Sequence, residues 1–372
     1  MSPPPVPTPS LDIPPSSNTV KVSIIDSTTQ MTGIPAASFF EPAINGFEKF
    51  SGCSYSFLIE HEPSGDKLLF DLGTRKDVEN HAAAVVQMLE AAKGTPSLKV
   101  EKNVSDILEE NGVELGAVTD IIWSHRHFDH TGDPSVFPAS TNLVVGPGFR
   151  DAIGEGYPQK EDSVCTSSAW EGRNLIELDF ATDRRATRVG GWDAVDWFGD
   201  GSFYVLHSTG HTNEHLCGLA RTKLAAHSSS SGKDEFILMA GDVCHHVGEY
   251  RPSRFRPIPD EISPDPRRPP FAGGVCPGEC HARRNMRHEG DDRWREAFFV
   301  PRANYSDNHE LALRSVSVLQ EFDAQDNILV VFAHDNTLYD VVELYPKDAT
   351  DWKDKGWQQE GRWRFLEDFA QA

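Results

Sequence analysis

Residues 123–133 have the sequence WSHRHFDHTGD, in which three imidazoles and one carboxylate fall within six positions. The four residues are His125, His127, Asp129 and His130. A largely apolar run at 119–124 precedes them and predicts a buried strand that ends where the histidines begin. Imidazole and carboxylate groups are ligands of zinc and related divalent metals. A solvated polar loop explains any one of these residues but not the four together, so we expect a metal site.

Three more polar side chains stand in the same kind of position, directly after a predicted strand. His211 follows the strand 202–207, Asp242 follows 236–240, and His334 follows 327–333. A polar group at a buried strand end is costly unless it has a partner. Each residue alone has a simpler explanation as a turn, a cap or a hydrogen-bonded core residue. A metal centre explains all of them at once.

The remaining elements are those of an α/β protein. Alternating or continuous apolar runs predict further strands at 20–26, 55–60, 67–71 and 216–221. Apolar residues at helical spacing predict helices at 75–92 and 104–110. Another helix is expected to begin with a capping box formed by Asp307 and Glu310. Residues 134–200 are expected to hold short strands and loops.

Two segments lie outside this pattern. Residues 1–18 are rich in proline and serine, which predicts a disordered tail, and residues 19–372 are expected to form a single domain. Residues 250–306 contain many prolines and arginines without periodicity, which predicts a lid or insertion over one end of the fold.

The charge balance restricts the partners. The 372 residues include 35 Lys and Arg against 57 Asp and Glu, a formal net charge of −22. This argues against a nucleic-acid or membrane partner, because a surface that binds phosphate groups must supply cations. The sequence shows neither an apolar run of the roughly 18 residues that span a bilayer nor a signal-peptide pattern. With six scattered cysteines, we expect a cytoplasmic protein with a small-molecule substrate.

These motifs resemble those of the metallo-β-lactamase superfamily of binuclear metallohydrolases. The resemblance rests on the H-x-H-x-D-H pattern at 125–130, Gly-His-Thr around His211, Gly-Asp at Asp242, and His334 after a strand. It extends over residues 20–345 and implies a four-layer αββα sandwich with the metal site at one edge of the sheets. It also implies two Zn²⁺ per chain as cofactors.

The resemblance assigns a role to each residue of the pattern. The ligands of the first zinc would be His125, His127 and His211, and those of the second Asp129, His130 and His334. Asp242 would bridge the two ions, and Asp71 would support the ligands from behind.

The same resemblance implies the reaction. A hydroxide bridging the metals would attack a carbonyl, with Asp129 orienting the nucleophile and passing its proton on. The element 209–212, followed by His215, and the later Asp335 are similar to those of acyl-homoserine lactonase-like and fungal lactone- or lactam-opening enzymes. We therefore expect a zinc-dependent hydrolase that opens a lactone or lactam, with a xenobiotic or secondary metabolite as substrate and detoxification as a role.

Two points remain open at this stage. Bacterial lactonases carry a tyrosine three residues after the bridging aspartate, whereas this chain has His245 there, either as a catalytic hydrogen-bond donor or as an exposed loop residue. An acyl-carrier-protein thioesterase of polyketide biosynthesis, using the same centre, is the alternative function. It is favoured only by the arginines of the predicted lid, which are Arg251, Arg254, Arg256, Arg267 and Arg268.

Overall fold

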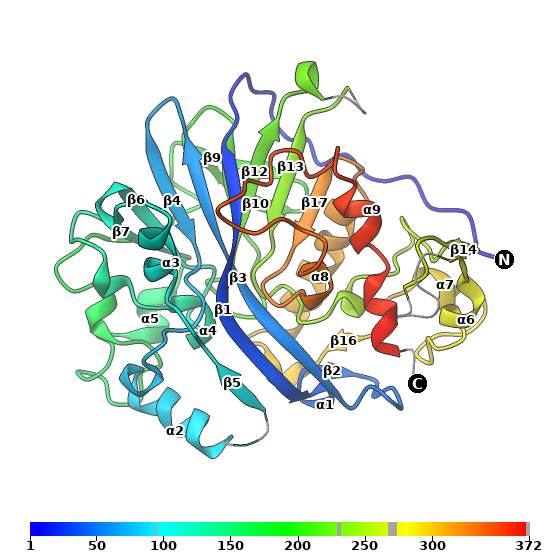
Figure 1. Cartoon of the computed structure of the whole chain (residues 1–372), viewed down its shortest axis with the longest axis horizontal. Helices are drawn as coiled ribbons and strands as arrows, with labels where there is room; N and C mark the ends of the chain where they lie inside the picture. Colours follow the sequence, from blue (N-terminus) through cyan, green and yellow to red (C-terminus); the bar gives the residue numbers. More distant parts are fainter. Residues whose placement is uncertain (93, 95, 229–231, 267–273, 370–372) are drawn as a thin grey trace.

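Two β-sheets lie face to face in the middle of the molecule, with helices on both outer sides (Figure 1). The structure is a computed structural model that describes residues 1–92, 94, 96–228, 232–266 and 274–369. The expected four-layer αββα sandwich is therefore confirmed.

The first sheet has seven strands in the order β5-β1-β3-β4-β6-β7-β8. Strands β5, β1, β3 and β4 pair antiparallel, and β4, β6, β7 and β8 pair parallel. The strands are β1 (Lys21–Pro35), β3 (Lys49–His61), β4 (Asp66–Phe70), β5 (Ser97–Lys99), β6 (Val118–Ile122), β7 (Asn142–Val145) and β8 (Leu175–Glu177).

The second sheet has six strands in the order β17-β13-β12-β11-β10-β9. Its pairs are antiparallel except for β13 and β17. The strands are β9 (Ala186–Val189), β10 (Trp192–Asp196), β11 (Phe203–His207), β12 (Leu216–Lys223), β13 (Glu235–Met239) and β17 (Ile328–Val331). Two small ribbons pair β2 (Phe40–Glu41) with β16 (Val300–Pro301) and β14 (Glu261–Ile262) with β15 (Cys276–Pro277).

Helices cover both outer faces of the sandwich. The first sheet is flanked by α2 (Ala83–Ala91), α3 (Val104–Glu110), α4 (Phe128–Thr131) and α5 (Phe149–Ile153), and the second by α8 (His309–Asp323) and α9 (Trp357–Gly361) (Figure 1). The remaining short helices are α1 (Ala36–Phe39), α6 (Gly278–Ala282) and α7 (Asp292–Arg295).

The alternation of apolar side chains along the strands builds three cores. In β3, Phe57 and Ile59 face the second sheet, whereas Leu58 faces the helices outside the first sheet. In β13, Ile237 packs between the sheets and Leu238 packs toward α8. Because each fully buried side chain of this size contributes about 1.5 to 3 kcal/mol, these three layers hold the strand ends in place.

The predicted helix at 75–92 is shorter in the structure. Arg75 donates hydrogen bonds to Asp77 and Asp133, and this network holds the start of the segment in a loop. Ala82 has an extended backbone, so α2 begins only at Ala83. The predicted helix at 104–110 coincides with α3, whose capping box joins Asn103 and Asp106.

Residues 1–18 run along the outside of the second sheet without forming a helix or strand. The backbone N–H of Gly190 donates to the carbonyl of Leu11 at 2.7 Å, and Arg221 donates to the carbonyl of Pro14 at 2.6 Å. Leu11 is buried against the second sheet. The division into a disordered tail and a single domain stays a prediction.

No helix within the described ranges combines the length and the apolar character needed to cross a membrane.

Candidate metal centre

The carboxyl ends of four strands bring the predicted ligands to one edge of the sandwich. Strands β11, β13 and β17 run in the same direction, so the loops that follow them lie together. These loops carry His211, Asp242 and His334, and the loop after β6 carries the histidine-rich stretch 125–130. The buried strands therefore gather polar groups that are far apart in the sequence.

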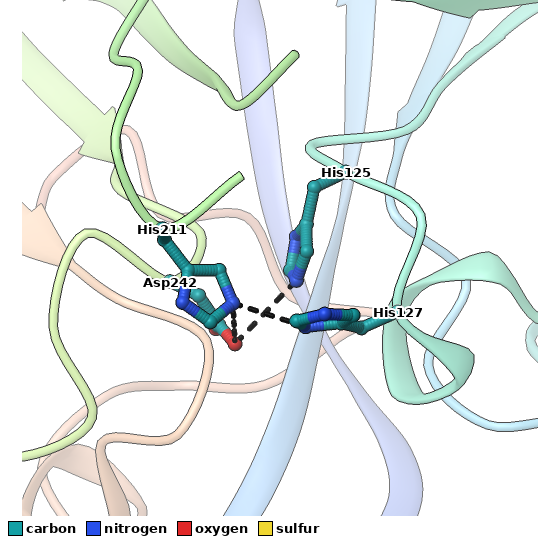
Figure 2. A group of neighbouring side chains, drawn as sticks. All are labelled: His125, His127, His211 and Asp242. Atoms are coloured by element: carbon teal, nitrogen blue, oxygen red, sulfur yellow. Dashed lines mark hydrogen bonds and ion pairs between the residues drawn. The ribbon is translucent and has the colours of Figure 1, made fainter. Parts of the chain in front are cut away.

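Two groups of side chains meet there. His125, His127, His211 and Asp242 have ligand atoms within 4.8 Å of one another (Figure 2). Oδ2 of Asp242 lies 3.7 Å from Nε2 of His125 and 3.6 Å from Nε2 of His211. Nε2 of His211 lies 3.0 Å from Nδ1 of His127.

The second group consists of Asp129, His130 and His334, whose ligand atoms also lie within 4.8 Å of one another. Oδ1 of Asp242 lies 3.2 Å from Nε2 of His130 and 3.1 Å from Nε2 of His334. Asp242 thus turns one oxygen toward each group. The structure brings together all seven side chains that the sequence motifs single out.

A buried imidazole nitrogen without a partner shows that this cluster fits a metal. Nε2 of His125 is buried and makes no hydrogen bond to any part of the chain that the structure describes, and its nearest carboxylate oxygen, Oδ2 of Asp242, is 3.7 Å away. Leaving such an atom without a partner costs about 1 to 3 kcal/mol. Imidazole nitrogens and carboxylate oxygens at this spacing suit a divalent cation, so the cluster is a divalent metal site.

The pKa values of the histidines shift in opposite directions in the two groups. Burial lowers the pKa of His125 and His211 well below the usual 6.5, and it lowers that of His127 to about 4. Burial opposes the charged form of His130 and His334 too, but the carboxylate of Asp242 outweighs it and raises the pKa of both. The first group therefore offers neutral imidazoles, which is the form that binds a metal.

A large cavity of about 1310 Å³ opens onto both groups. The ligand candidates in its wall are His127, Asp129, His211, Asp242 and His334. Its far walls are mostly apolar and come from β1, α1, β3, α2 and β5; they include Met31, Ile34, Phe39, Phe50, Val86, Leu89 and Leu98. The cavity gives a small molecule access to the polar cluster along an apolar surface.

Comparison with known proteins identifies the family. No family model matches the chain. Gamma-lactamase FDB1 of Fusarium pseudograminearum is 43% identical over 368 residues, which cover 97% of this chain and 85% of that protein. Metallo-hydrolase mfmC of Annulohypoxylon moriforme is 37% identical over 377 residues, which cover 99% of this chain and 92% of that protein. The chain belongs to the metallo-β-lactamase superfamily.

Solved structures show the superfamily fold as well. An N-acyl homoserine lactone hydrolase with N-hexanoyl-L-homoserine bound at its catalytic metal centre superposes with a TM-score of 0.53 at 17% identity. The match covers 89% of this chain and 99% of that protein. The chain described here, like these relatives, is a metal-dependent hydrolase.

Asp71 lies behind the second group. Its Oδ2 is 2.9 Å from Nδ1 of His130, and its Oδ1 accepts a hydrogen bond from the backbone N–H of Ser124 at 2.7 Å. The backbone of Asp71 is left-handed, with a φ of +59°, a conformation that aspartate tolerates better than most residues. Asp71 therefore orients His130 without facing the cavity.

His215 supports the shared carboxylate in a similar way. The backbone N–H of Asp242 donates to Nε2 of His215 at 2.9 Å, so the ring proton is on Nδ1, which lies 2.8 Å from Oγ of Ser208. Between them, Gly241 has a φ of +50°, and a Cβ there would lie 2.7 Å from Nε2 of His215. Glycine is required for this close approach.

His245 lies in the cavity wall and is buried, which excludes the exposed-loop alternative. Its Nε2 is 3.2 Å from Oδ2 of Asp242, and its backbone N–H donates to Glu249 at 2.6 Å. The imidazole can therefore face a substrate next to Asp242.

Sequence reasoning missed Tyr305, which also lines the cavity. Burial, together with the charges of Asp129 and Asp242, raises its pKa, so the phenol stays protonated. The residue lies in the stretch 250–306, which has no periodicity, and no motif in the sequence marks it.

The arginines of the predicted lid do not line the cavity where the structure describes them. Arg251 forms a buried ion pair with Asp323 at 2.6 Å, and Arg256 donates to the carbonyl of Ala324 at 2.8 Å. Arg254 lies over the ring of Phe255. Arg267 and Arg268 lie outside the described residues.

Proposed function

We propose that this chain opens a lactam or lactone ring by hydrolysis at a centre that holds two Zn²⁺. The observation that supports it most is the placement of Asp242, which turns one oxygen to each of two groups of buried ligand atoms. A relative of similar length and 43% identity carries the name gamma-lactamase. A cyclic amide or ester is thus the class of substrate we assign.

The proposed ligands are His125, His127 and His211 for one ion and Asp129, His130 and His334 for the other, with Asp242 between them. When bound, the two cations would polarise the scissile carbonyl and lower the pKa of a water molecule. Asp129 lines the cavity, and we assign its carboxylate to take the proton of the attacking water and deliver it to the ring nitrogen or oxygen that leaves. His245 would donate a hydrogen bond from Nε2 to the substrate.

The composition of the cavity wall supports a neutral small molecule as the substrate. Its far walls are largely apolar, and the net charge of −22 disfavours polyanions. The thioesterase alternative gains nothing from Arg251, because this lid arginine is buried against Asp323. We therefore retain the ring-opening reaction.

A hydrolysis panel combined with metal analysis tests this function. The panel contains 2-oxindole, 2-coumaranone, 2-benzoxazolinone, N-hexanoyl-L-homoserine lactone, a penicillin and a linear acyl thioester. We expect about two zinc ions per chain and ring opening of at least one cyclic substrate. Activity on the thioester alone, or full activity after chelation, would contradict the proposal.

A pair of variants connects the activity to the centre. Asp242→Asn removes the negative charge that the two groups share. The variant should bind less zinc, and its hydrolytic activity should fall at least 100-fold. Asp193→Asn is the matched control, because Asp193 is an exposed residue of β10 that pairs only with Arg188 among the ion pairs of the described chain. Equal losses in the two variants would show that the effect is not specific to the centre.

We also propose a cytoplasmic location and a role in detoxification. The six cysteines, all within the described ranges, form no disulfide, which suits a reducing compartment. Cell fractionation checks the location, and growth of a deletion strain on the best cyclic substrate checks the role.

A further inference from the structure

One short segment, at the boundary between the stretch 250–306 and α8, reaches the metal centre. Asn304, Tyr305, Ser306 and Asp307 line the cavity, and they come just before α8. The ring of Tyr305 lies 4.1 Å from that of Phe39 and 5.2 Å from that of His245, measured between centroids. Its centroid is also 6.0 Å from that of His211. The ring therefore packs against Phe39 of the apolar wall and lies beside His245 and the proposed ligand His211.

An arginine of the histidine-rich stretch holds this segment. Nη2 of Arg126 donates to both carboxylate oxygens of Asp307, at 2.8 and 2.9 Å. Nη1 of the same side chain lies 2.7 Å from both oxygens of Glu214. Charge-assisted contacts of this kind are stronger and more directional than neutral ones. Arg126, in the loop after β6, thus connects the segment just before α8 with the loop after β11.

Backbone contacts fix the same junction. The N–H of Asp307 donates to the carbonyl of His211 at 3.0 Å, and the N–H of Asn308 donates to the carbonyl of Gly210 at 3.0 Å. Asp307 also accepts from the backbone N–H of Asn213 at 3.1 Å. Tyr305, two residues before Asp307, is therefore held at a fixed place relative to His211.

The side chain of Arg126 itself does not contact the cavity. It is not among the described residues that line the cavity, although it lies between His125 and His127 in the sequence. Its two carboxylate partners use the donors on both Nη atoms.

We propose that Tyr305 is a catalytic residue of this enzyme, whose hydroxyl donates a hydrogen bond to the substrate oxygen at the metal centre, and that Arg126 positions it through Asp307. The inference rests on the proposed ring-opening function. Tyr305 is the one tyrosine among the described residues of the cavity wall. The histidine at position 245 and the phenol at position 305 then act as two neighbouring donors on one side of the centre.

The first test replaces the hydroxyl alone. Tyr305→Phe should lower kcat for 2-coumaranone or 2-oxindole about 10- to 100-fold, the loss typical of one preorganised donor. KM should change less than threefold and the zinc content should stay the same. Tyr339→Phe is the matched control, because Tyr339 is also half-buried but donates to Asp26, away from the cavity. This control should keep the activity of the parent protein.

Binding provides a readout that does not depend on turnover. The probes are (2-hydroxyphenyl)acetate and (2-aminophenyl)acetate, the ring-opened products of the two substrates. Calorimetry with the zinc-loaded protein should show weaker binding of both products to the Tyr305→Phe variant and unchanged binding to the Tyr339→Phe variant.

A double-mutant cycle tests the positioning by Arg126. Asp307 is the site of choice, because replacing Arg126 would also disturb the adjacent histidines. Asp307→Ala should lower kcat in the parent protein but cause little further loss when combined with Tyr305→Phe. Asp307→Asn should keep part of the activity, since its amide oxygen still accepts from Arg126. Losses that multiply would show that Asp307 does not act through Tyr305.

The outcomes separate the inference from the function on which it rests. If the parent protein opens a ring and Tyr305→Phe retains its activity within twofold, the inference is wrong and the function stands. If Tyr305→Phe loses zinc along with activity, the residue is structural and the inference is also wrong. If the parent protein neither hydrolyses any compound of the panel nor binds the two acids, the proposed function is wrong, and the inference that rests on it is wrong as well.

Discussion

Asp71 illustrates how the centre depends on a residue that faces no cavity. Its carboxylate accepts from Ser124 and contacts Nδ1 of His130. In Asp71→Asn the amide tolerates the left-handed backbone, but one accepting oxygen is replaced by an NH₂ group. The variant should therefore fold normally and lose zinc affinity at the site of His130 by about 10- to 100-fold. Competition with a chelating dye measures this affinity.

A nearby carboxylate provides the control for that prediction. Asp120 lies in β6 and contacts Asn142, on the same sheet but without contact to a proposed ligand. Asp120→Asn should leave zinc affinity unchanged. A normal zinc affinity of Asp71→Asn would mean that His130 keeps its orientation without the carboxylate.

At the residue scale, what could be predicted depended on position relative to the strands. His211, Asp242 and His334 each follow a buried strand, so the sequence itself indicated that they share an edge of the sandwich. Tyr305 could not be found in this way, because the sequence predicts no strand before its segment and the two-residue strand β16 is too short to leave a pattern. Its place is set by Arg126, and the ion pair between positions 126 and 307 leaves no pattern in the sequence.

Among the elements, α8 depends on how it begins. Asp307 was predicted to cap this helix, but the structure assigns the cap to Asn308, whose side chain accepts from the N–H of Leu311 at 3.1 Å. Asp307 is engaged by Arg126 instead. Asn308→Ala should therefore lower the free energy of unfolding by about 1 kcal/mol, as loss of a cap usually does. Urea denaturation measures the change.

The conservative variant Asn308→Ser serves as the control for the cap. Serine also accepts a hydrogen bond at this position, so Asn308→Ser should cost only a few tenths of a kcal/mol. A loss of equal size in both variants would show that the effect does not come from the side-chain cap.

The elements also show where local sequence signals were sufficient. Helix α3 matched its prediction because a capping box marks its start and Asn111 marks its end. Strand β1 extends to Pro35, well past the predicted end at residue 26. This extension pairs with β3 through register shifts, and such irregular pairing depends on the partner strand, which a local pattern cannot report.

For the molecule as a whole, the acidic surplus lies almost entirely outside the centre. Only Asp129 and Asp242 of the 57 acidic residues are proposed as metal ligands. The three apolar cores contain no acidic side chain, so their packing does not depend on the surplus charge. The net charge could be counted from the sequence. That most acidic residues lie away from the buried histidines of the metal centre follows only from the way the two sheets pack.

A buried charge cluster joins distant parts of the chain and predicts how stability depends on pH. Asp323, at the end of α8, contacts Arg251 at 2.6 Å and Arg362 at 3.1 Å. Removing one member of such a cluster leaves buried charges without compensation. Asp323→Asn should therefore lower the free energy of unfolding by about 3 to 5 kcal/mol at pH 7.

The pH dependence of that loss follows from the pKa of Asp323. Burial opposes the ionised form, but Arg251 outweighs it and holds the pKa below the usual 3.8. The stabilisation is thus complete above pH 3.8 and is lost as the pH falls through the lower folded-state value. The difference between the parent protein and Asp323→Asn in urea denaturation should shrink in that range. Asp326→Asn, an exposed control that pairs with Lys233, should differ by less than about 1 kcal/mol at every pH. A difference for Asp323→Asn that stays constant down to the acid limit would show that packing, not charge, joins these segments.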